Sequence, residues 1–175
     1  MPYLALLVLA ALSTGYEVTT PEARLVMPYA VTQTSEMKTR TPWGRAHASD
    51  YSTSDANGGL FYSFTVFRVP GNKKLEATLL AKTPEYFLAN KKCVANIVDQ
   101  KPLADTGGTL WPQISFKGHC AASSSDYRVL VLIAGSSVYQ FHVGYLPRQN
   151  NSPEVRDGSL EEALINMIGR FSCCD

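Results

Sequence analysis

The chain has 175 residues, and its 16 basic side chains nearly balance its 15 acidic ones, which gives a formal net charge of +1. So small a charge provides no general attraction to nucleic acid or to an anionic membrane, and we expect no nucleic-acid partner. The lysines at positions 73, 74, 82, 91, 92 and 101 are interpreted as a solvated face. The length suits one well-buried domain better than two, and we predict a single domain over residues 16–175.

The N-terminal segment has the pattern of a secretory signal peptide. Residues 4–12 are uniformly apolar, residues 13–15 are small, and no charge precedes Glu17. This apolar run is shorter than the roughly 20 residues that cross a bilayer. We therefore expect residues 1–15 to be removed, leaving a secreted or periplasmic protein with no stable membrane anchor. The missing positive n-region counts against export, and a buried N-terminal helix or strand is the alternative.

Four strand-like segments open the mature chain, at residues 24–28, 30–39, 43–53 and 60–69. A strong turn signal, Ser54 to Gly59, precedes the fourth segment, which indicates a meander. Apolar side chains alternate onto both faces of residues 60–69. We therefore expect this strand to need cover on two sides.

A helix is predicted next, over residues 84–98. Thr83 is a suitable N-cap, Pro84 suits the first helical position and Glu85 the first turn. Apolar residues then recur at three- and four-residue steps, which places Cys93 on the buried stripe.

The second half is predicted to return to strands. Residues 110–117 form a strand that Pro112 marks as an edge or bulged strand. Residues 127–134 and 138–146 form a hairpin about Gly135-Ser136, and the first of these is the expected central strand.

A closing helix follows. Ser159 and Glu162 make a capping box, Leu160 to Ile168 supply the inner face, and Gly169 ends the helix. An antiparallel sheet with helices on it is an α+β fold, here expected as an α/β/α layered sandwich.

Four cysteines allow three disulfide pairings, between which the sequence does not choose. A direct Cys173–Cys174 bond would need a strained ring, because neighbouring Cα atoms are too close. We therefore predict that Cys93 and Cys120 each bond one of Cys173 and Cys174. None of the four lies in a Cys-x-x-Cys spacing, so metal and thioredoxin-type sites are disfavoured.

Motifs for phosphate, dinucleotide, zinc-protease and serine-hydrolase sites are absent from the sequence. His47, His119 and His142 are isolated, so we expect no metal and no cofactor. The pair His119-Cys120 suggests an activated thiol, but consecutive side chains of an extended chain point to opposite faces. Aromatic residues that could line a ligand groove are interpreted as core: Trp43, Trp111, Tyr51, Tyr62, Tyr139 and Tyr145.

Several local patterns together resemble the PsbP-like superfamily. They are Arg24-Leu25-Val26-Met27-Pro28, the Thr-Pro-Trp-Gly passage at 41–44, Thr83-Pro84-Glu85, Phe116-Lys117-Gly118-His119, and the strand pair from Tyr127 to Phe141, with the closing helix last. The resemblance covers roughly residues 22–171 and implies a small exported α+β domain of bacterial type. The cysteine set departs from that pattern and indicates a disulfide-stapled variant.

The resemblance implies an accessory or binding domain without common catalytic residues. We therefore expect an exported, non-enzymatic domain acting through a sheet face or edge loops on an unknown protein or small-molecule ligand. The alternative is a thiol-dependent enzyme or redox protein using Cys120 or the Cys173-Cys174 pair. Alkylation without reductant, which counts free thiols, distinguishes the two.

Overall fold

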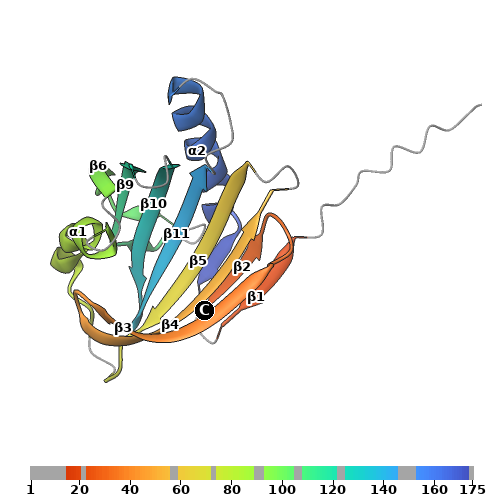
Figure 1. Cartoon of the computed structure of the whole chain (residues 1–175). Helices are drawn as coiled ribbons and strands as arrows, with labels where there is room; N and C mark the ends of the chain where they lie inside the picture. The colour runs from red at the N-terminus through yellow and green to blue at the C-terminus, as the bar shows by residue number, and fades with distance from the viewer. Residues whose placement is uncertain are drawn as a thin grey trace, which may run out of the picture.

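The computed structural model describes residues 15–20, 23–55, 59–71, 74–88, 93–104, 108–121, 125–145 and 153–173. Its main feature is a seven-stranded antiparallel sheet in the order β3-β4-β5-β11-β10-β9-β6 (Figure 1). The strands of this sheet are β3 (Gln33–Thr41), β4 (Gly44–Ser54), β5 (Leu60–Arg68), β6 (Cys93–Asp99), β9 (Gln113–Cys120), β10 (Ser125–Ala134) and β11 (Ser137–Tyr145). The mostly antiparallel α+β class is therefore confirmed.

Short turns set the register of the large sheet. Gly135 and Ser136 join β10 to β11, and Gly135 has φ +61°, a backbone conformation that glycine adopts without strain. The predicted hairpin is thus confirmed, and its strands share one sheet with β5. The middle position belongs to β11 rather than to β10, which lies beside it.

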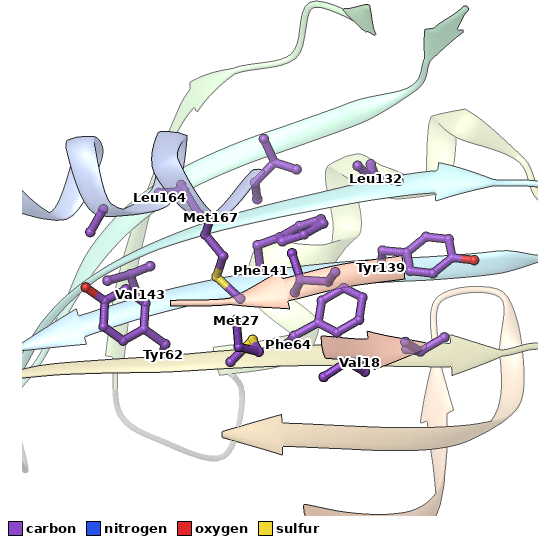
Figure 2. Close-up of a cluster of buried hydrophobic side chains, with 14 of the residues drawn as sticks. Val18, Met27, Tyr62, Phe64, Leu132, Tyr139, Phe141, Val143, Leu164 and Met167 are labelled. Atoms are coloured by element: carbon purple, nitrogen blue, oxygen red, sulfur yellow. The ribbon is translucent and has the colours of Figure 1, made fainter. Parts of the chain in front are cut away.

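One face of the large sheet is covered by a helix and a small second sheet. The small sheet has the order β1-β2-β12, from β1 (Tyr16–Thr19), β2 (Ala23–Met27) and β12 (Phe171–Cys173), and the helix is α2 (Pro153–Ile168). Figure 2 shows side chains of β2 and α2 gathered against those of β5 and β11. Phe64, Phe141 and Leu132 are fully buried here, so this is the main hydrophobic core.

The opposite face has a second core under two short helices, η1 (Ala77–Lys82) and α1 (Thr83–Leu88). Leu75 and Leu80 pack there against alternate residues of the same strands, including Val131 and Phe116. Val131 on this face and Leu132 on the other are both 0% exposed. The expected burial on both faces of these strands is therefore present. The remaining strands, β7 (Leu103–Ala104) and β8 (Leu110–Trp111), pair with each other.

The predicted helix over 84–98 is wrong in its length. The start signals at Thr83 and Pro84 do begin a helix, but it ends at Leu88, and residues 93–99 form strand β6. Val94, Ile97 and Val98 are β-branched and favour a strand, in which Val94 and Ile97 pair with β9 and Val98 lies at a bulge. The three- and four-residue spacing of apolar residues was therefore coincidental.

Two further boundaries differ from expectation. Pro112 separates β8 from β9, and β9 lies between β10 and β6 rather than at an edge. Helix α2 begins at Pro153, so Ser159 lies inside it and does not cap it, whereas the predicted inner face of Leu160 and Met167 is buried. Strand β12, after the helix, was not predicted.

The predicted signal peptide falls almost wholly outside the described residues, which begin at Gly15. Within the part of the chain that is described, no helix is long and apolar enough to cross a bilayer.

Candidate functional site

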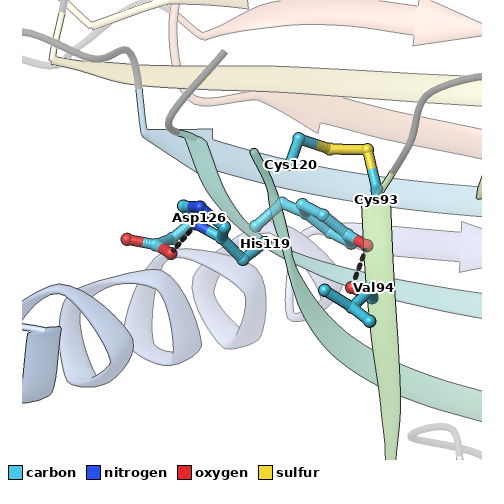
Figure 3. The surroundings of a disulfide bond; sticks show 6 residues. Cys93, Val94, His119, Cys120 and Asp126 are labelled. Carbon is cyan, nitrogen blue, oxygen red and sulfur yellow. Dashed lines mark hydrogen bonds and ion pairs between the residues drawn. A yellow bond between two sulfur atoms is a disulfide. The ribbon is translucent and has the colours of Figure 1, made fainter. Parts of the chain in front are cut away.

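A disulfide joins Cys93, the first residue of β6, to Cys120, the last residue of β9 (Figure 3). The two residues are direct register partners, and their Cα atoms are 4.1 Å apart. This spacing fits a pair of opposed residues on neighbouring antiparallel strands. The predicted bonds from Cys93 and Cys120 to the tail are therefore wrong, because the prediction placed Cys93 on a helix and never opposite Cys120.

A buried tyrosine fastens the same end of β6 from the side of the short helices. The hydroxyl of Tyr127 on β10 donates a 2.8 Å hydrogen bond to the backbone carbonyl of Val94, and so spans β9 between them. Gly118 of β9 lies beneath the ring, where an added Cβ would collide with the Val94 carbonyl and the Tyr127 hydroxyl. Burial raises the pKa of Tyr127 to about 12, so the hydroxyl stays protonated as the donor.

On the other face of these strands, His119 and Asp126 form a pair. The His119 Nδ1 atom lies 2.9 Å from Asp126 Oδ1, and the two residues are opposed on β9 and β10 (Figure 3). The imidazole is half exposed. The neighbouring Cys120 side chain lies on the opposite face of β9 and is held in the disulfide, so His119 has no thiol to activate there.

The outer side of β6 is the most unusual surface of this region. Val94, Ile97 and Val98 are 65%, 49% and 47% exposed. Within the described residues β6 pairs only with β9, and α1, which lies beside it, leaves these three side chains open to solvent. Edge strands usually carry charges or proline that discourage pairing. Here the first charge of the strand is Asp99, its last residue.

The remaining predicted residues do not converge on a site. Cys173 lies on β12 opposite Ala23, and Cys174 lies outside the described residues. His142 packs its ring against Phe61 and Tyr127. Among the residues that the structure describes, no group of three potential ligands could hold a metal ion.

The aromatic residues were interpreted correctly as core. Tyr62, Tyr139 and Tyr145 are buried, and Tyr51 and Trp111 pack against the same core. Trp43 packs against the second core and also lines an open hollow at the turn between β3 and β4.

Sequence reasoning missed the Tyr127–Val94 contact and the register that opposes Cys93 to Cys120. The signal for the second was present, since residues 93–99 include three β-branched residues and most of residues 113–120 fell in a predicted strand. Interpreting the first segment as a strand would have made a cross-strand disulfide the natural pairing.

The arrangement of the strands and helices matches a solved structure. The solution structure of cyanobacterial PsbP (CyanoP) from Synechocystis sp. PCC 6803 superimposes with a TM-score of 0.57, covering 94% of this chain and 95% of that one. The chain has a PsbP-like fold. The two sequences are 8% identical, so the PsbP-like likeness concerns the fold alone. No protein-family model and no curated protein matches the sequence.

Proposed function

We propose that this protein is an exported, non-enzymatic binding domain that receives an extended segment of a protein partner along the outer edge of β6. The exposed apolar edge, fixed in place by a disulfide, is the observation that carries the proposal. In such β-augmentation the partner's backbone continues the hydrogen-bonding ladder, and its alternate side chains contact those of the host strand.

Three features support a receptor edge rather than a frayed strand. The disulfide holds the first residue of β6, the Tyr127 hydroxyl holds the second, and β9 pairs without interruption from Cys93 to Ile97, before a bulge at Val98. A prearranged edge loses little conformational entropy when a partner binds. The partner segment is therefore expected to alternate apolar residues.

Export is part of the proposal. It rests on the apolar leader before Tyr16 and on the disulfide, since disulfides persist in oxidising compartments. Intact-mass analysis of material secreted by an expressing cell should show a chain that lacks residues 1 to about 15. Retention of Leu4 to Leu12 in that material would contradict the leader.

The test of the edge uses a displayed random-peptide library panned on the oxidised protein. We expect enriched peptides with alternating apolar residues, which lose about tenfold or more in affinity for Val94→Lys. Met37→Lys is the matched control, because Met37 is 53% exposed on β3 at the other edge of the same sheet. Peptides that bind both variants equally, or a selection without enrichment, would refute the edge as the binding surface.

The thiol-dependent alternative depends on which cysteines are free. In this structure Cys120 is oxidised, which leaves the Cys173-Cys174 pair as the remaining candidate. Alkylation of the native protein under denaturing, non-reducing conditions counts the free thiols. Complete protection of all four cysteines would remove the nucleophile and support the binding function.

A further inference from the structure

The end of the large sheet farthest from β6 carries an unusual arrangement of positive charge. Lys38 of β3 is the direct register partner of His47 of β4, and Arg40 is the direct partner of Arg45. Opposed residues of an antiparallel pair lie on the same face, a few ångströms apart at Cβ. Two rows of basic side chains therefore cross this hairpin. The first row is Lys38 with His47, and the second is Arg40 with Arg45.

The first row continues onto the next strand. His47 is also the register partner of Arg68 on β5, whose guanidinium donates a 3.2 Å hydrogen bond to Ser49 Oγ. Lys38, Arg40, Arg45 and His47 are exposed, and no described carboxylate forms an ion pair with any of these four. Glu36 lies on the same face of β3, two residues before Lys38.

Like charges placed directly opposite each other on a sheet are destabilising. The chain as a whole has a net charge of +1, so this concentration does not follow from a generally basic composition. All four basic residues also line one open hollow of about 640 Å³. That volume lies in the range of small-molecule sites, roughly 300–1,000 Å³.

We propose that the end of the β3–β4 hairpin is a binding site for a small multivalent oxyanion such as a short oligophosphate. The guanidinium groups of Arg40 and Arg45 can each bind phosphate or carboxylate oxygens through two parallel hydrogen bonds. Lys38 adds a point charge. Binding relieves the repulsion between Arg40 and Arg45 and neutralises the charge of Lys38.

The spacing of the rows specifies a ligand with more than one anionic group. The rows are two residues apart along the strands, which is about 7 Å. One phosphate contacts a single row, whereas a chain of three phosphates or a compact tricarboxylate reaches both. The hairpin is also held firmly, because Thr41 Oγ1 donates to the Gly44 carbonyl and the Trp43 indole donates to the Glu76 carbonyl.

Calorimetric titration of the oxidised protein with inorganic tripolyphosphate tests the site, with orthophosphate at equal ionic strength as the comparison. We expect tripolyphosphate to bind about tenfold or more tighter than orthophosphate, and Arg40→Gln or Arg45→Gln each to weaken it by about tenfold or more. Arg170→Gln is the matched control, since Arg170 is exposed near Tyr62 at the opposite end of β5. A titration with citrate in the same experiment measures whether the site also binds a tricarboxylate.

A second readout separates binding from a structural role. Removing one of two opposed charges should raise the melting temperature of the ligand-free protein, while the additional rise on adding tripolyphosphate is lost. A lower melting temperature for free Arg45→Gln would contradict the opposed-charge argument. Equal weakening by Arg170→Gln, no preference over orthophosphate, or capture by phosphatidylglycerol vesicles without tripolyphosphate binding would overturn the small-ligand site.

Discussion

Gly118 shows how one missing side chain holds the disulfide-bearing edge together. The Tyr127 ring crosses β9 at Gly118 to reach the Val94 carbonyl, and a Cβ atom at this position would occupy the space of both groups. The backbone of Gly118 does not require a left-handed conformation, since its φ is not positive. The residue is glycine because of the close approach, and any side chain must displace the tyrosine.

We therefore predict that Gly118→Ala lowers the free energy of unfolding by about 2 kcal/mol or more, from lost hydrogen bonding and overpacking. Gly158→Ala is the control, because nothing lies within 4 Å of its added Cβ and it is in helix α2. That change should be neutral or stabilise by up to about 1 kcal/mol. Urea unfolding measures both, and equal effects at the two sites would contradict the role of Gly118.

Leu132 shows how the burial of one side chain determines the effect of a substitution on stability. It is 0% exposed on β10 within the main core. Leu132→Asp should unfold the domain, because an unpaired buried charge costs several kcal/mol. Ile165→Asp places the same charge on α2 at a side chain that is 61% exposed, and it should leave the circular dichroism spectrum and melting temperature nearly unchanged. A folded Leu132→Asp protein as stable as wild type would contradict the buried position.

Among the elements, β6 is the strand that the sequence pattern predicts as part of a helix. Its apolar residues satisfy both a helical stripe and a strand, and nothing local decides between them. The deciding contacts are long-range, since β6 pairs with β9 and is bonded to it through Cys120. By contrast, β5, β10 and β11 could be predicted because each is an apolar run beside a glycine-containing turn signal, which permits few other structures.

The disulfide yields a prediction for the β6–β9 pair. Replacing both Cys93 and Cys120 by alanine should lower the free energy of unfolding by about 3 kcal/mol or somewhat less, from the chain entropy of a loop between cysteines 27 positions apart. Reduction of the wild-type protein should produce a similar loss. Peptide mapping without reductant should recover Cys93 linked to Cys120. Linkage of either residue to Cys173 or Cys174 would show that the register is wrong.

The basic hairpin illustrates a second limit of sequence reasoning. The predicted strands at 30–39 and 43–53 leave a break at this turn, and alternation of basic residues on both sides of it is visible in the sequence. Opposed like charges become apparent only when the register is known, because a shift of one residue would place them on different faces. The lysines that were grouped from the sequence are a different set.

At the scale of the whole molecule, two buried tyrosines set the response to alkaline pH. Burial raises the pKa of Tyr62 and of Tyr127 to about 12, from an ordinary value of 10.0. The folded state therefore holds these protons more tightly than the unfolded state does. Their contribution to stability is complete below pH 10 and is lost as the pH rises from about 10 to 12.

Urea midpoints measured across that pH interval should fall less steeply for Tyr62→Phe and Tyr127→Phe than for wild type. Tyr16→Phe is the control, because Tyr16 is 47% exposed. Three parallel slopes would contradict the assignment of the alkaline loss to the two buried hydroxyls.

The small sheet brings the first and last described strands together, with Phe171 of β12 opposite Leu25 of β2 and in contact with the rings of Phe64, Trp111, Tyr139 and Phe141. A chain that is synthesised from its N-terminus presents β2 long before β12 exists, so Leu25 and Met27 lack part of their cover until Phe171 has been made. A product terminated before Phe171 would expose an apolar surface along β2, which proteases can recognise.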